Sequence, residues 1–455
     1  TNLTGATLTG ATVTGVDFTG TVLNGITTGS LDGAPAHLPQ DWSMAQEYLV
    51  GPGAALRDAD LVGADLSGAI LAGTDLEGAD LSNADLTGAD LTDANILDAD
   101  LSGATLSGLV TKETAGPPAA LPSGWIYVRF STPKGYLVGP AADLAGADLS
   151  YEAVTGADLR GADLSNANLS GTIFTNVDLS GADLSGSTLT SATLTGANLA
   201  GVDLTGVSSG SILGQPVALP TNWWLVEGTL IGPGAHLAGD DLSNLDLTGA
   251  HLSGADLSGA DLTATDLTGA DLSNADLSRS ELTGVKITAA DITAADLTGA
   301  TTTGVVSGSL VGSPQCVTST STCVVRGYLI EPGVNLVGVD LSGASLGYVD
   351  LTGADLTDAL FVGATISYPP SHLDGANLSG ADITNATLDS LSLAGADLSG
   401  TEFSGASFSR ISSGGISTTP VGLPSSWRLV SGYLVGPTAN LDGANLSRAD
   451  LSGLD

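Results

Sequence analysis

Leucine, or a large apolar residue in its place, returns every five residues along most of the chain, as in ADLSGADLTATDLTGADLSNADLS over residues 255–278. An α-helix would place its apolar residues about 3.6 positions apart, and a half-buried strand would place them about 2 apart. Repetition on this scale predicts a stacked architecture built from many copies of one small unit. The runs extend from Leu56 to Leu106, Leu144 to Leu204, Leu237 to Leu297, Leu336 to Ile366 and Leu373 to Phe408, with partial runs from Leu3 to Leu23 and from Leu441 to Leu451.

Each unit reads Ala, Asp or Asn, Leu, Ser or Thr, and Gly. The leucine and the alanine two positions before it share strand parity, so both point to one side while the polar residues point to the other. Glycine in the last place suits the turn position that has φ > 0 in a type II turn. Each unit therefore predicts one short side and one corner, and four sides close a square coil of about 20 residues. A helix is disfavoured, because glycine in every unit would cost about 1 kcal/mol each.

This motif resembles that of the pentapeptide-repeat family, A-(D/N)-L-x-x, as in Ala255-Asp256-Leu257-Ser258-Gly259. The resemblance implies an all-β fold, the right-handed quadrilateral parallel β-helix. The handedness rests on the resemblance alone.

The repeat stops five times, and the interruptions are similar to one another. Residues 219–237 read LPTNWWLVEGTLIGPGAHL, and residues 423–441 read LPSSWRLVSGYLVGPTANL. Two apolar runs around Glu227-Gly228 predict a β-hairpin, and the prolines mark sharp entries and exits. We therefore expect a β-helix that is interrupted by short β-hairpin inserts.

The expected organisation alternates between β-helix and insert. The expected inserts are residues 29–55, 111–143, 209–236, 307–335, which holds the cysteine pair, and 413–440. The expected β-helical stretches are residues 1–28, 56–110, 144–208, 237–306, 336–412, with a register slip near 367–372, and 441–455.

Tryptophan and tyrosine gather in the inserts, because a column filled with leucine and alanine cannot absorb such large side chains. We expect them to pack each hairpin over a coil end or side. Contacts between subunits are a second interpretation, and carbohydrate stacking is a third. These insert anchors are Trp42, Tyr48, Trp125, Tyr136, Trp223, Trp224, Tyr328, Trp427 and Tyr433.

The fourth insert differs, since residues 316–323 read CVTSTSTC where the other inserts place a tryptophan. A disulfide between Cys316 and Cys323 would contribute about 2.5 kcal/mol in the chain-entropy model. We expect this pair to be oxidised, which favours an extracellular or cell-surface location. A metal site is disfavoured here, because no histidine or further cysteine lies nearby in the sequence.

The formal net charge is −38, so the surface would repel nucleic acid and anionic membranes. A packed interior is nevertheless expected, because 42% of the residues are apolar. No segment approaches the roughly 20 apolar residues of a membrane span. Both ends of the sequence lie within the repeat, so we expect the chain to be a window of something longer.

No catalytic constellation is evident, and the chain is not expected to be an enzyme. The histidines are scattered among surface or insert positions, and no phosphate-binding loop occurs. These histidines are His37, His236, His251 and His372.

Aspartates at equivalent positions of the repeat form ladders along the coils. Their mutual repulsion would raise some pKa values or recruit cations, and Ca²⁺ is a possible ligand. A solvated face is the other interpretation. Representative positions are Asp256, Asp261, Asp266, Asp271 and Asp276.

These observations favour a non-enzymatic structural or interaction protein, a rigid acidic rod that contributes to an extracellular filament, stalk or surface scaffold. Open coil ends predict that its partner is itself, joined head-to-tail or laterally. One alternative follows from the resemblance, because some pentapeptide-repeat proteins imitate duplex DNA and act on DNA gyrase or topoisomerase. A second alternative is a Ca²⁺-dependent surface-layer protein or adhesin.

Overall fold

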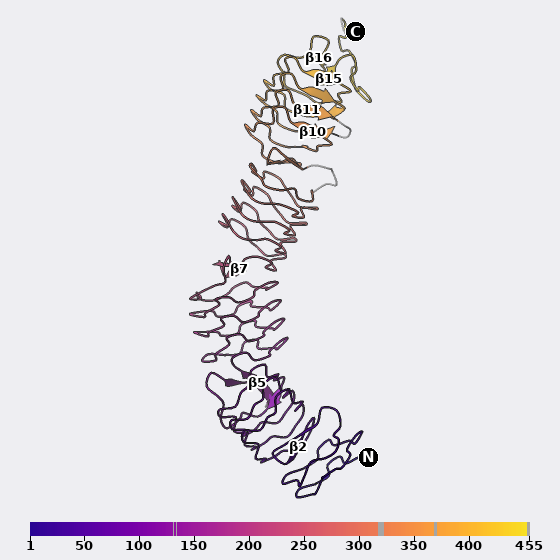
Figure 1. Cartoon of the computed structure of the whole chain (residues 1–455). Helices are drawn as coiled ribbons and strands as arrows, with labels where there is room; N and C mark the ends of the chain where they lie inside the picture. Colours follow the sequence, from indigo (N-terminus) through magenta and orange to yellow (C-terminus); the bar gives the residue numbers. More distant parts are fainter. Residues whose placement is uncertain (131, 133, 317–322, 368–370, 453–455) are drawn as a thin grey trace. The chain divides into compact units, whose positions relative to one another are not determined.

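The computed structural model describes residues 1–130, 132, 134–316, 323–367 and 371–452, and it divides into two compact units, Thr1–Leu230 and Ile231–Asp455 (Figure 1). Each unit is described by itself. Among these residues no helix has the length and apolar character that crossing a membrane requires.

In the first unit the chain winds into coils whose sides pair in parallel with the sides of the next coil. Within the regular runs each bridging residue pairs with the residue twenty positions further on, which is four repeat units, so a coil has four sides. The predicted quadrilateral parallel β-helix is confirmed. The bridges join Asp60 to Asp80, Asp65 to Asp85, Ile70 to Asp90 and Asp75 to Asn95.

Every corner is closed by one tight turn. Ala64 N–H donates to the carbonyl of Leu61 at 3.0 Å, and Gly63 between them has a φ of 64°. Asn83 takes the same place in another corner with a φ of 58°, a conformation that asparagine tolerates better than most residues. Each side is therefore too short to form more than a single bridge.

Leucine and alanine fill the inside of the coils, as the strand parity predicts. Leu81 and Ala79 are fully buried, and the leucine side chain contributes about 1.5–3 kcal/mol by leaving water. A few units place threonine at the alanine position. Thr74 is fully buried, and its hydroxyl donates to the carbonyl of Gly51 at 3.1 Å. The equivalent hydroxyls of Thr172, Thr265 and Thr401 donate to the carbonyls of Leu149, Leu242 and Leu378.

The first, fourth and fifth inserts each form a two-stranded antiparallel sheet, and the third forms a two-stranded sheet. The second insert forms a three-stranded antiparallel sheet in the order β3-β5-β4. The strands of the five inserts are β1 (Ser43–Ala45) and β2 (Tyr48–Val50); β3 (Thr114–Ala115), β4 (Ile126–Arg129) and β5 (Lys134–Val138); β6 (Trp224–Val226) and β7 (Thr229–Ile231); β8 (Val324–Val325) and β9 (Tyr328–Leu329); β16 (Arg428–Val430) and β17 (Tyr433–Val435).

The β-helix extends further into the inserts than the sequence predicts. Asp32 and His37 still pair with Thr12 and Asp17 of the preceding coil, although they lie within the expected insert 29–55. Thr27 then pairs with Ala55, so the hairpin leaves and rejoins a continuous coil. The sequence does not predict these sides because each keeps a leucine that faces the interior but lacks the rest of the five-residue repeat motif.

In the second unit some sides are long enough to form regular strands. A parallel sheet has the order β10-β11-β13-β15, of which Figure 1 labels β10, β11 and β15. Strand β12 pairs with β14. Asp350 pairs with His372, two positions beyond the usual spacing, which is where the slip was expected; residues 368–370 lie outside the described part. The strands are β10 (Ser345–Gly347), β11 (Thr365–Ser367), β12 (Ser371–His372), β13 (Thr387–Asp389), β14 (Leu391–Ser392) and β15 (Ser407–Ser409).

Replacing an inward leucine should destabilise the first unit strongly. Leu81→Ala leaves a cavity in the inward leucine column. We expect the free energy of unfolding, measured in urea, to fall by about 2–5 kcal/mol. The control is Leu213→Ala, at a side chain that is 59% exposed, where we expect a change within about 0.5 kcal/mol. Equal effects of the two substitutions would contradict the inward column.

Candidate functional site

The aspartates of the expected ladder each cap their own corner. Asp256 Oδ1 accepts the backbone N–H of Ser258 at 3.1 Å, and Asp276 Oδ1 accepts that of Ser278 at 2.8 Å. Asp261, Asp266 and Asp271 make the same bond to Thr263, Thr268 and Ser273. One oxygen of each carboxylate therefore stabilises the turn that follows it.

At two of the ladder aspartates, Asp246 and Asp266, hydrogen bonds outweigh repulsion between carboxylates and lower the pKa. The Thr248 hydroxyl and N–H hold the pKa of Asp246 below its ordinary value, and those of Thr268 do the same for the pKa of Asp266. The expectation that mutual repulsion raises pKa values is therefore wrong at these positions. Asp240 differs, because burial at the alanine position raises its pKa.

Basic side chains of the chain itself lie beside some ladder carboxylates. Lys286 Nζ lies 3.1 Å from Asp266 Oδ2, and His236 Nδ1 lies 2.9 Å from Asp256 Oδ2. Across the described residues, three potential metal ligands come within 4.8 Å of one another at one place, formed by Cys316, Cys323 and Glu331 and not by a ladder. Calcium binding at the ladders stays a prediction.

Cys316 and Cys323 form a disulfide with a Cα–Cα distance of 5.7 Å; residues 317–322 between them lie outside the described part. In other inserts an indole lies flat on a glycine: a Cβ on Gly51 would stand 2.4 Å from Trp42, and one on Gly436 would stand 2.3 Å from Trp427. Glu331 takes that glycine's place and is 1% exposed. Sequence reasoning missed Glu331, although Glu-Pro in place of Gly-Pro was the available signal.

The aromatic anchors pack mainly on their own chain. The Tyr48 hydroxyl accepts the N–H of Asp60 at 3.2 Å, and the Tyr433 hydroxyl accepts that of Asn445 at 3.3 Å, so each fastens a hairpin to a following coil. Trp125, Tyr136, Trp223 and Trp427 are buried, whereas Trp42, Tyr48, Trp224, Tyr328 and Tyr433 are partly buried.

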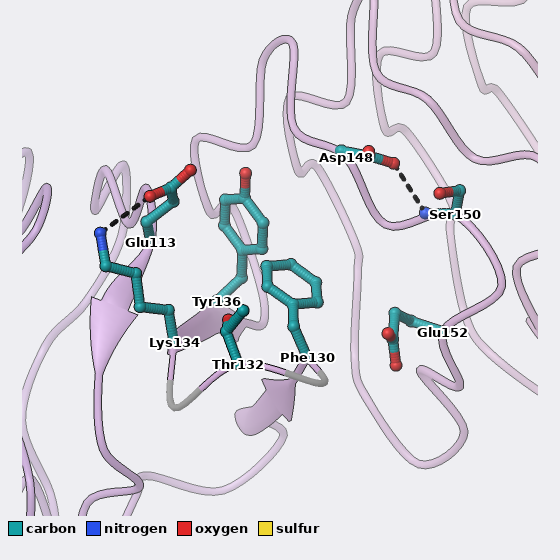
Figure 2. Close-up of a pocket in the computed structure, with 8 residues that line it drawn as sticks. All are labelled: Glu113, Phe130, Thr132, Lys134, Tyr136, Asp148, Ser150 and Glu152. Atoms are coloured by element: carbon teal, nitrogen blue, oxygen red, sulfur yellow. Dashed lines mark hydrogen bonds and ion pairs between the residues drawn. The ribbon is translucent and has the colours of Figure 1, made fainter.

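A hollow of about 580 Å³ opens beside the three-stranded insert (Figure 2). Phe130 and Tyr136 meet edge to face there, with ring centroids 5.2 Å apart. Lys134 Nζ donates to Glu113 Oε2 at 2.9 Å on one side of the rings. Sequence reasoning did not find this site, and its one signal was the longer middle of that insert.

The histidines do not form a catalytic group with a nucleophile in the described part of the chain. His236 pairs with Asp256, and His372 Nδ1 lies 3.3 Å from Asp374 Oδ2. His37 pairs through its backbone with Asp17, and His251 with Asp271. Their positions are those of ordinary side residues of the coils.

The family model described as pentapeptide repeats matches more than half of the sequence. The matched residues are 1–25, 53–88, 69–108, 141–176, 172–208, 234–269, 260–299, 333–367 and 371–410.

Two solved structures illustrate the similarity. HetL, a pentapeptide repeat protein involved in heterocyst differentiation regulation from the cyanobacterium Nostoc sp. strain PCC 7120, is 26% identical, with 66% of this chain and 88% of that chain covered and a TM-score of 0.15. A trypsin-treated form of QnrB1, a plasmid-mediated fluoroquinolone resistance protein, is 16% identical, with 66% of this chain and 91% of that chain covered and a TM-score of 0.10. No curated protein matches the chain.

The expectation that the chain's partner is another copy of itself is wrong against these findings. HetL is described by a role in regulating differentiation and QnrB1 by drug resistance, and neither description is one of self-assembly. Head-to-tail or lateral stacking is therefore set aside.

Acid should destabilise the coils. Hydrogen bonds from the serine two positions on lower the folded-state pKa of Asp65 and Asp80, so their stabilisation is complete above the unfolded pKa and is lost as the pH falls through the folded one. We expect the melting temperature to fall below about pH 4.

The matched variant for this test is Asp65→Asn/Asp80→Asn, which keeps both Oδ1 acceptors but cannot titrate, and it should show a shallower acid dependence. A melting temperature that rises on acidification would show that repulsion between carboxylates dominates.

Reduction of the disulfide should destabilise the second unit by roughly 2.5 kcal/mol, because the crosslink restricts the unfolded chain. Chemical unfolding with and without a phosphine reductant measures the difference. The double variant Cys316→Ser/Cys323→Ser should not respond to reductant. Superimposed unfolding curves of the unaltered chain in both conditions would contradict the prediction.

Proposed function

The chain belongs to the pentapeptide-repeat family, and we propose that it is a non-enzymatic scaffold that binds a basic surface of another protein through its carboxylate-bearing faces. The observation that carries the proposal is the register of the carboxylates. Asp60 pairs with Asp80 and Asp80 with Asp100, so the same face repeats an aspartate from coil to coil.

The arrangement leaves acceptor capacity on that face. Ser82 and Ser102 donate backbone N–H groups to the Oδ1 atoms of Asp80 and Asp100, at 3.0 and 2.8 Å, so each carboxylate keeps its second oxygen as an acceptor. With a net charge of −38, the field of the whole chain would attract a basic partner and speed its encounter. Rigid coils hold the charges at fixed spacing, which favours a partner with matching lysines or arginines.

The disulfide supports an oxidising setting, so we place this scaffold outside the cell or at its surface. The second candidate is an imitation of duplex DNA that acts on a type II topoisomerase, and the regular ladder of negative charge favours it. Inhibition of supercoiling by purified gyrase at stoichiometric concentrations of the chain would select this second candidate over the first.

The test compares two variants of equal charge. Asp60→Asn/Asp80→Asn/Asp100→Asn neutralises neighbours on one face, whereas Asp65→Asn/Asp90→Asn/Asp203→Asn neutralises three that are not neighbours. Asparagine preserves the corner, as the chain's own Asn95 and Asn168 show by capping Leu97 and Ser170.

Binding of a fluorescent lysine-rich peptide is measured for each variant at two salt concentrations. We expect the one-face variant to lose at least fivefold more affinity than the dispersed variant, and affinity to fall with salt. Equal losses would mean that overall charge alone attracts the peptide, and the proposed face would be wrong.

A further inference from the structure

The hollow in the first unit lies between the three-stranded insert and the coil that follows it (Figure 2). One wall is made by Phe130, Thr132 and Tyr136 of the insert, and the other by Asp148, Ser150 and Glu152 of the coil. A hollow also opens beside the first hairpin, where Tyr48 and Asp60 take the places of Tyr136 and Asp148. The first hairpin therefore offers an internal comparison.

The insert wall departs from the other inserts. The first hairpin turns at Gln46-Glu47 directly after its short strand, and its hollow of about 450 Å³ contains no aromatic residue besides Tyr48. The second hairpin continues past Arg129, which adds Phe130 to the wall, against the edge of the Tyr136 ring. The added residues thus bring a second aromatic ring into the larger hollow.

The coil wall departs from the repeat at the same place. The unit around Val154 has Glu152 where the neighbouring units have the buried alanines Ala147 and Ala157. Two separate segments therefore break their own patterns where they face one hollow, which packing alone does not require.

The charges in the hollow are unevenly matched. Lys134 is held by Glu113 at 2.9 Å and by Asp93 at 2.8 Å, so its ammonium does not neutralise the opposite wall. Asp148 Oδ1 accepts bonds from Ser150 N and Asn168 Nδ2. Within the described residues the Glu152 carboxylate has no hydrogen-bond or ion-pair partner. Figure 2 shows the Phe130 ring between Tyr136 and these two carboxylates.

We propose that this hollow binds the side chain of a lysine or arginine that the partner protein inserts. The cationic head lies between Asp148 and Glu152, and the aliphatic stem packs on Phe130, where cation–π attraction adds to the burial of the stem. The inference rests on the proposed function, because it names the point at which a basic partner is held. Carboxylates supply charge along the faces, and the hollow supplies shape.

The first probe is Nα-acetyl-lysine methylamide, whose side chain is a free ammonium. The second is the same compound with its side-chain nitrogen, Nζ, also acetylated. Saturation-transfer NMR on the full chain measures their affinities. We expect the free ammonium to bind and the acetylated probe to bind at least fivefold more weakly. Equal affinity of the two probes would overturn the proposal. Spermidine binding tighter than the lysine probe, with the same residue dependence, would assign the hollow to a free polyamine and would overturn the protein partner.

Three variants locate the binding. Glu152→Ala restores the residue that the repeat prefers, so it should keep the fold while lowering affinity for the lysine probe at least fivefold; Phe130→Leu should lower it about threefold. Glu47→Gln, an equal loss of charge at the hollow of the first hairpin, should leave it unchanged. Unchanged affinity in Glu152→Ala, with an unaltered melting temperature, would overturn the site.

Failure of this inference is distinguishable from failure of the proposed function. If the one-face aspartate variant loses the lysine-rich peptide while Glu152→Ala keeps it, the scaffold stands and the hollow does not. If Glu152→Ala loses the peptide and the one-face variant keeps it, the hollow binds and the ladder is not the recognition surface.

Discussion

On each side of a regular coil, one residue uses both of its backbone groups to bond to the preceding coil. Asp80 N–H donates to Ala59 O at 2.9 Å, and Asp80 O accepts Leu61 N–H at 2.8 Å. Because the residue that makes both bonds lies between an alanine and a leucine, its own side chain must point outward while theirs point inward. The coil spacing, the leucine column and the carboxylate faces all follow from this one pairing.

The sequence predicts this part well because it is local. A spacing of five, small residues beside leucine, and glycine at the corner determine side, face and turn without knowledge of distant residues. Gly63 at a φ of 64° and Asn83 at 58° are the corners that the pattern requires. The slip before His372 is equally visible, since two residues are added between otherwise regular runs.

Features that depend on residues far apart in the sequence were not predictable in the same way. Asp32 and His37 lack the motif, yet the coil before them offers free backbone partners and continues the β-helix through them. Some aspartate pKa values were expected to rise by repulsion, but at Asp246 and Asp266 the hydroxyl and N–H of the threonine two positions further on lower the pKa. The hollow brings Phe130 and Glu152 together from two separate segments, and nothing in the sequence links one residue to the other.

The buried threonines have a consequence for which residues the inside of the coils can hold. Each of these hydroxyls donates to the backbone carbonyl 23 positions earlier, a group that the preceding coil supplies whatever its side chains are. The carbonyls of Gly51 and Leu149 accept the hydroxyls of Thr74 and Thr172, so neither hydroxyl is buried without a partner, which would cost about 1–3 kcal/mol each. A hydroxyl therefore replaces the alanine methyl at these places, and the interior admits a polar residue wherever the backbone itself accepts its hydrogen.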